Sequence, residues 1–196
     1  MSPRGVPVVG LHERLFTAAE QLLVRKGPGA LDSRSITSEA GCAKGVLHNH
    51  FGNLDAFLTA FAADRLRHVL DTAARLPGRA GEGDVTENLA TTAVEAFGSS
   101  SMAIVGLLTA RPQLQPLVQD ALGVCANLQG LETAFAAYFA AEAELGRITP
   151  HAEPEFLALM FVGTLHHLVA SGRSGVGDLG ERVKKIATVL VGVDQA

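Results

Sequence analysis

The sequence has little of what builds a β-sheet or a disulfide framework. Trp is absent, aromatic residues make up 5% of the 196 positions, and Ala, Leu and Val supply most of the apolar content. This composition favours packed helices over a sheet, which is usually rich in β-branched and aromatic side chains. Two cysteines, Cys42 and Cys125, are too few for a disulfide framework. We expect both to be buried apolar residues, and we expect an all-α fold.

Export and membrane signals are also lacking. The first ten residues carry no hydrophobic segment of the kind that directs export. We find no run of about 18 uncharged apolar residues, and the nearest candidate, residues 156–170, is shorter and contains two His. We therefore expect a cytoplasmic protein with no membrane partner.

Charge is distributed unevenly along the chain. The net charge is −4, yet residues 1–68 hold eight Lys and Arg against six Asp and Glu, together with four of the seven His. The first third is therefore mildly basic and the remainder acidic. This asymmetry suits a head that binds a polyanion, although a difference of this size also arises by chance.

Apolar spacing predicts about nine helices. They cover approximately residues 11–26, 33–40, 44–50, 53–76, 84–97, 102–110, 116–145, 154–172 and 178–191. Asp32, Asn53 and Asp84 stand where N-caps are expected, and Pro154 suits a first helical turn. Residues 77–83 are rich in Gly and form the clearest linker.

A helix-turn-helix is predicted by the two short helices at 33–40 and 44–50. Gly41 supplies the left-handed backbone position that the tight turn needs. Ile36, Ala40, Leu47 and Phe51 can then bury against the first helix. The second helix presents its donors outward, as reading bases in a major groove requires. From spacing alone, a plain helical hairpin within a bundle remains the alternative.

Residues 36–51 read Ile-Thr-Ser-Glu-Ala-Gly-Cys-Ala-Lys-Gly-Val-Leu-His-Asn-His-Phe. This segment resembles the signature of the TetR family of repressors, and the resemblance is specific over about residues 10–60. It implies a helix-turn-helix DNA-binding domain at 1–52 and a ligand-binding and dimerisation domain at 53–196, joined by a linking helix at 53–76. It also implies binding to duplex DNA. The residues we expect at that interface are Arg34, Ser35, Lys44, Gly45, Val46, His48, Asn49, His50 and Asn53.

Several positions depart from the family pattern. Thr37 replaces an Ala in a tight helix contact, and Ala43 replaces a Ser that would cap the recognition helix. Val46 and His48 replace a Thr and a Tyr that often touch DNA. Leu54 replaces a Lys at the start of the fourth helix. These changes predict fewer phosphate contacts or a different operator.

The resemblance further implies an effector pocket among the fifth to eighth helices. We expect it to take a small apolar or aromatic molecule held by few hydrogen bonds, although each apolar candidate is individually more typical of plain core. Adjacent His166 and His167 point about 100° apart on a helix, which disfavours a shared metal ion, and we expect neither a metal nor a cofactor. The candidate lining residues are Phe97, Met102, Leu107, Arg111, Asn127, Leu128, Phe135, Tyr138, His166 and His167.

The sequence carries no Gly-rich phosphate loop, no Gly-x-Ser-x-Gly and no His-Glu-x-x-His, so we do not expect an enzyme. The leading interpretation is a dimeric, ligand-responsive repressor of a palindromic operator. A DNA-binding regulator gated by a protein partner is one alternative, and a helical carrier or enzyme without DNA binding is another. For the homodimer we expect the last two helices to form a four-helix bundle with their mates through Val183, Ile186 and Leu190.

Overall fold

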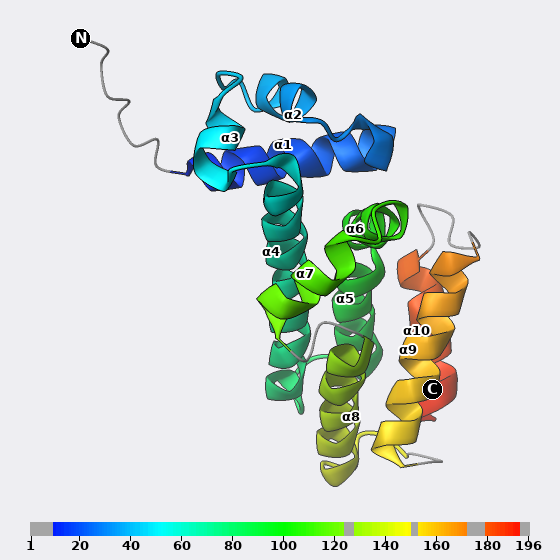
Figure 1. Cartoon of the computed structure of the whole chain (residues 1–196). Helices are drawn as coiled ribbons and strands as arrows, with labels where there is room; N and C mark the ends of the chain where they lie inside the picture. The colour runs from blue at the N-terminus through cyan, green and yellow to red at the C-terminus, as the bar shows by residue number, and fades with distance from the viewer. Residues whose placement is uncertain (1–9, 124–127, 150–152, 172–178, 193–196) are drawn as a thin grey trace.

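The computed structural model describes residues 10–123, 128–149, 153–171 and 179–192. These residues form α-helices and two short 3-10 helices, with no strand among them, which confirms the all-α expectation (Figure 1). The first elements are α1 (Leu11–Lys26), η1 (Pro28–Ala30), α2 (Ser33–Glu39), α3 (Val46–Phe51), α4 (Leu54–Arg75) and η2 (Leu76–Arg79). The remaining helices are α5 (Val85–Phe97), α6 (Ser99–Ala110), α7 (Leu114–Leu122), α8 (Leu128–Glu144), α9 (Pro154–Ala170) and α10 (Leu179–Val191).

Helices α1 to α3 form a small head at one end of the molecule, and α4 runs from it into the body (Figure 1). The predicted caps hold the helix starts in place. Asp32 accepts hydrogen bonds from the backbone N–H groups of Arg34 and Ser35 at 2.8 and 2.9 Å. Asn53 and Asp84 likewise accept from the third residue of α4 and of α5. Each cap satisfies backbone donors that have no partner within the helix.

The prediction of a single long helix at 116–145 is wrong, because the chain forms two separate helices there, α7 and α8. Gly123 follows α7 with φ of 79°, in the left-handed region that ends helices and favours glycine. The continuous apolar stripe on both sides of Gly123 concealed this break.

The most membrane-like segment also differs from the expectation. Val85–Ala110 is long and apolar enough to cross a membrane by length and composition alone. Gly98, however, divides it into α5 and α6 with an extended backbone conformation. A Cβ at Gly98 would lie 2.5 Å from the carbonyl oxygen of Val94, so the sharp bend requires glycine.

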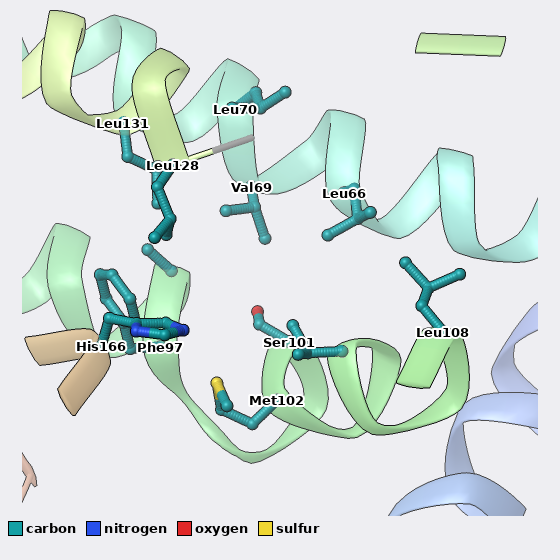
Figure 2. Close-up of a pocket in the computed structure, with 12 residues that line it drawn as sticks. Leu66, Val69, Leu70, Phe97, Ser101, Met102, Leu108, Leu128, Leu131 and His166 are labelled. Atoms are coloured by element: carbon teal, nitrogen blue, oxygen red, sulfur yellow. The ribbon is translucent and has the colours of Figure 1, made fainter. Parts of the chain in front are cut away.

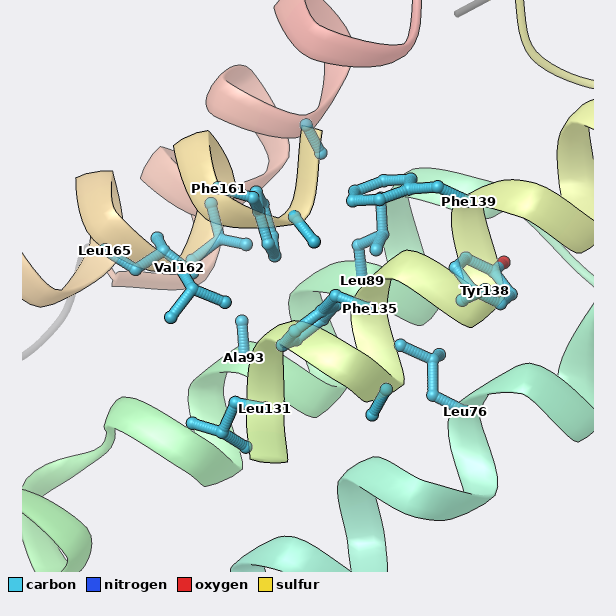
Figure 3. Close-up of a cluster of buried hydrophobic side chains, with 14 of the residues drawn as sticks. Leu76, Leu89, Ala93, Leu131, Phe135, Tyr138, Phe139, Phe161, Val162 and Leu165 are labelled. Carbon is cyan, nitrogen blue, oxygen red and sulfur yellow. The ribbon is translucent and has the colours of Figure 1, made fainter. Parts of the chain in front are cut away.

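Two hydrophobic cores hold the molecule together, and α4 belongs to both. The first core joins α1 to α3 with the N-terminal half of α4, α6 and α7; it includes Phe57, Phe61 and Leu107. The second joins the end of α4 with α5, α8, α9 and α10 around Phe135, Phe139 and Phe161 (Figure 3). The head therefore packs directly on α6 as well as on α4, while α7 packs on α4.

Arg65 of α4 fastens α1 to α4. Its guanidinium lies 2.8 Å from Glu13 and 3.0 Å from Glu20, both on α1, and 2.8 Å from Asp64. It also lies within 6 Å of the ring centroids of Phe16 and Phe61. The Arg65 side chain is only 18% exposed. This partly buried network is better protected from solvent screening than a surface ion pair.

The connection at 77–83 is less free than its composition suggested. Residues 76–79 form η2, and the backbone N–H of Gly81 donates to the buried Glu142 carboxylate of α8 at 3.3 Å. Arg147 pairs with Glu142 and donates to the carbonyl of Gly83. The far end of α4 is thereby pinned to α8.

A second polar contact joins α5 to α8, where Asn88 donates to the hydroxyl of Tyr138 at 3.0 Å. Burial, together with the nearby Glu142 carboxylate, raises the pKa of Tyr138.

We expect Arg65→Met to lower the free energy of unfolding by about 1–2 kcal/mol, because it leaves clustered carboxylates without their cation. The guanidinium of Arg65 holds the pKa of Glu13 below its usual value of 4.5. A carboxylate with a lowered pKa stabilises the fold above that usual value and loses its contribution as the pH falls through the folded-state pKa. The deficit of Arg65→Met should therefore shrink on acidification, as measured by urea unfolding across pH.

Arg25→Met is the matched control. Arg25 pairs with Glu39 at 3.0 Å on the surface, and its side chain is 54% exposed. Its loss should change the free energy of unfolding by less than about 0.5 kcal/mol. Equal effects of the two substitutions would show that the Arg65 network contributes no more than an ordinary surface pair.

Candidate nucleic-acid interface and internal cavity

The turn between α2 and α3 has the geometry predicted from Gly41. Its φ is 63°, and the N–H of the next residue, Cys42, donates to the carbonyl of Thr37 at 2.8 Å. Ile36 and Leu47 are fully buried against the head core, while Ala40 and Phe51 are half-buried. The turn and the core together fix the direction in which α3 presents its outer face.

That outer face carries hydrogen-bond donors and no acid. Lys44, His48, Asn49 and His50 are all exposed, and no Asp or Glu occurs between positions 40 and 53. Such a surface is chemically suited to phosphate oxygens and to the acceptor-rich edges of bases. Gly45, at the start of α3, is exposed as well.

The other predicted interface residues have varied surroundings. Arg34 is exposed on α2, whereas the Ser35 hydroxyl donates to Asp32 at 2.7 Å. Val46 is half-buried, and Asn53 is exposed but uses its side-chain oxygen to cap α4. Ser35 and Asn53 therefore each already use a side-chain polar atom in a hydrogen bond within the protein.

The departures from the family pattern have visible consequences. Ala43 replaces the capping Ser, and among the described residues no side chain caps α3, which begins after Gly45. Thr37 is buried and its hydroxyl donates to the carbonyl of Ser33 at 2.8 Å, so the extra polar atom is satisfied within its own helix.

His12 of α1 is a neighbour of the recognition helix that the sequence reasoning missed. Its ring lies 4.7 Å from that of Phe51 and 5.7 Å from that of His50, measured between centroids. His12 is exposed. It adds a third imidazole to the face formed by His48 and His50. The sequence gave no sign of this contact, because His12 lies far from α3 along the chain.

A cavity of about 290 Å³, partly open to solvent, lies between α4, α5, α6, α8 and α9 (Figure 2). Helix α4 contributes Leu66, Val69 and Leu70 to its wall. The cavity is near the lower end of the size range for ligand pockets, and it is mostly apolar, as such pockets usually are. The other lining residues are Ala96, Phe97, Ser101, Met102, Val105, Leu108, Leu128, Leu131 and His166.

Four of the expected ligand contacts meet in this cavity: Phe97, Met102, Leu128 and His166. Figure 2 shows His166 beside Phe97, and Val69 pointing from α4 toward Ser101 and Met102 on α6. Ser101 and His166 provide polar groups, and none of the described lining residues has a carboxylate, ammonium or guanidinium group. The cavity wall is thus chemically suited to an apolar molecule.

The remaining candidates lie elsewhere. Leu107 is buried in the head-side core, and Phe135 and Tyr138 are buried in the body core (Figure 3). His167 is exposed and does not line the cavity, and Asn127 falls outside the described residues. The sequence reasoning missed Leu66, Val69 and Leu70, whose apolar spacing on the linking helix was visible but equally typical of core packing.

Arg111, also a candidate, joins the body to the head. It follows α6, and its guanidinium donates to the carbonyl of Leu31 at 3.1 Å and lies 3.4 Å from the carboxylate of Asp55. Leu31 precedes α2, and Asp55 is in the first turn of α4. Since α6 also lines the cavity, Arg111 gives the cavity wall a second connection to the head beside α4.

Within the described parts of the chain, no group of three or more His, Cys, Asp or Glu residues is placed to hold a metal ion. Cys42 is half-buried in the head, and its thiol lies 3.5 Å from the carbonyl of Ala40. Cys125 lies outside the described residues.

Comparison with solved structures shows the fold. A TetR-family transcriptional regulator from Mesorhizobium loti MAFF303099 is 14% identical with a TM-score of 0.70, covering 96% of this chain and 98% of that one. The fatty acid degradation regulator FadR from Bacillus halodurans is 19% identical with a TM-score of 0.64, covering 98% and 99%. FadR from Bacillus subtilis, solved in complex with stearoyl-CoA, is 15% identical with a TM-score of 0.59, covering 92% and 97%.

Comparison of sequences locates the shared signature in the head. No curated protein matches the chain significantly. The sequence model described as bacterial regulatory proteins, tetR family, matches residues 15–61, which run from α1 into α4. The head therefore carries a sequence similar to that of the tetR-family regulators, and the chain shares its fold with TetR-family regulators along nearly its whole length.

Proposed function

We propose that this protein is a cytoplasmic repressor that binds a palindromic operator as a homodimer and is released by a small, largely apolar effector. One observation carries the proposal: the helix that forms one wall of the cavity is also buried in the head. Leu66, Val69 and Leu70 of α4 line the cavity. Phe57 and Phe61 of the same helix are fully buried in the head core.

Operator binding by this protein would use α3. A dimer occupies two major-groove half-sites only when its two recognition helices match the spacing of the DNA repeat. Lys44, His48 and Asn49 would contact bases or phosphates, with Arg34 on the neighbouring helix as a phosphate contact.

For the homodimer we propose a pairing surface on α9 and α10 that differs from the one expected from the sequence. Val183 is fully buried in the body core, and Ile186 and Leu190 pack against that core, so the expected face points largely inward. The outward apolar side chains are Phe156 and Leu159 of α9 and Val189 of α10, which are 53%, 50% and 78% exposed. We propose that these three pack against a second copy.

Gating follows from differential binding to two arrangements of the head. An effector that fits the cavity better when α4 and α6 are displaced favours heads that no longer match the operator. A tenfold loss of operator affinity requires a preference of about 1.4 kcal/mol for the displaced state. Helix α4 carries the displacement directly, and α6 carries it through Arg111.

The proposed function is tested by selecting operator duplexes from a random library and then screening uncharged apolar compounds for release of the selected duplex. Duplex binding with release by such a compound supports the proposal. Duplex binding that only a protein partner relieves would favour partner gating, and absence of salt-dependent duplex binding would favour a carrier or an enzyme.

Lys44→Ala should weaken duplex binding and reduce the slope of log affinity against log salt by about one, because one phosphate contact is lost. The measurement is fluorescence anisotropy at several salt concentrations. Lys185→Ala is the control, since Lys185 is exposed on α10 in the body. Identical salt slopes for Lys44→Ala and the unaltered protein would remove Lys44 from the interface.

Val189→Glu should convert the dimer to a monomer at low micromolar concentration, because it places a charge on a surface that pairing would bury. Sedimentation velocity measures the change. Val24→Glu is the control, since Val24 of α1 is 47% exposed but lies in the head. A Val189→Glu protein that sediments as a dimer would exclude this face.

Arg111→Ala should reduce the coupling between effector and duplex, because it removes the polar contacts that join the end of α6 to the head while leaving the cavity wall unchanged. We expect the effector to lower duplex affinity several-fold less than in the unaltered protein, within the range of about 0.5–2 kcal/mol for positions that modulate coupling. Titrating duplex with and without effector gives this ratio. Undiminished coupling would show that Arg111 does not transmit the displacement.

A further inference from the structure

A second cavity, with charged side chains in its wall, adjoins the apolar cavity. The second has a volume of about 200 Å³ and shares three lining residues with the first: Leu66, Val69 and Ser101. In Figure 2 these three lie along the side of the cavity formed by α4 and α6. The hydroxyl of Ser101 donates to the backbone carbonyl of Glu95 at 2.9 Å, which fixes this junction. One elongated molecule could therefore contact both cavities.

The second cavity is also mostly apolar, but unlike the first it has charged side chains in its wall. Its wall includes the carboxylates of Glu20 and Glu95, the guanidinium of Arg65 and the imidazole of His68. Glu95 accepts a hydrogen bond from Thr72 at 3.0 Å and lies 3.2 Å from His68. The side chains of Glu20 and Glu95 are 27% and 40% exposed, so they remain within reach of both water and the cavity.

In and around this cavity, acidic side chains outnumber basic ones. Arg65 is shared among Glu13, Glu20 and Asp64, so its positive charge is already balanced. The adjoining surface hollow adds one further acid, Asp71, and one further cation, Arg67. An anionic group placed here would be repelled by the carboxylates. An ammonium group would instead donate charge-assisted hydrogen bonds to them.

From this arrangement we propose that the effector is an amphipathic amine: an apolar body fills the cavity beneath Val69, and a protonated nitrogen lies against Glu95 and Glu20. This assignment rests on the proposed effector function of the apolar cavity and adds the charge of the ligand. Because the ammonium group stays at the partly exposed end, it keeps some hydration and avoids the full cost of burying a charge.

Three probes of equal chain length test the sign of that charge: octylamine, octanol and octanoate, titrated calorimetrically into the full-length protein at neutral pH. Octylamine should bind about tenfold more tightly than octanol, in keeping with one charge-assisted hydrogen bond, and octanoate most weakly. Glu95→Gln should reduce the ratio of amine to alcohol affinity to within about threefold.

Glu87→Gln is the matched control. Glu87 lies on the same helix as Glu95 but pairs with Lys184 of α10, away from the cavity, so its substitution should leave the amine-to-alcohol ratio unchanged. Equal binding of amine and alcohol, tightest binding of octanoate, or an unchanged ratio in Glu95→Gln would overturn the proposed amine while leaving the apolar cavity as an effector site. Failure of all three probes to bind would count against the cavity itself and thus against the proposed function.

Discussion

The structure depends on the burial of one helix in two hydrophobic cores. Phe57 and Phe61 fix the first half of α4 in the head core, and Ala73 and Leu76 fix its end in the body core. Close-packed cores transmit small displacements because they cannot absorb them as voids. The cavity lies against the stretch between these anchors, at Leu66, Val69 and Leu70. A molecule entering the cavity therefore acts on α4 between its two anchors.

Polar contacts decide which parts of this arrangement can move together. Glu142 and Arg147 pin the connection after α4 to α8, so the far end of the helix is held against the body. Arg65 binds α1 to α4, so the head follows the near end. Displacement of α4 at the cavity would then rotate the head about the pinned end. Arg111 ties the same head to α6, which makes the response depend on two walls of one cavity.

Much of the fold could be predicted because its signals are local. The caps at Asp32, Asn53 and Asp84 and the turn at Gly41 each depend on a few neighbouring residues, and all four are confirmed. The break at Gly123 was missed because the apolar stripes of α7 and α8 continue each other. The cavity residues were harder to predict from the sequence, since apolar side chains on a helix have the same spacing whether they face a core or a cavity. Phe135 and Tyr138 fill the core, while Leu66 and Val69 line the cavity, and only the packing of distant helices separates them. The apolar pattern of α10 also did not separate its buried side from its exposed side. Val183 was expected at the dimer surface but is buried, whereas Val189 is exposed and was not predicted there.

The central claim is that cavity and head are energetically coupled, and reciprocity provides its most direct test. The measurement is the affinity of an effector for the protein, by calorimetry, with and without a saturating selected operator duplex. If occupancy of the cavity displaces the head, the duplex must weaken effector binding by the same factor by which the effector weakens duplex binding. Equal effector affinities in the two titrations would contradict the coupling, even if effector and duplex each bind tightly on their own.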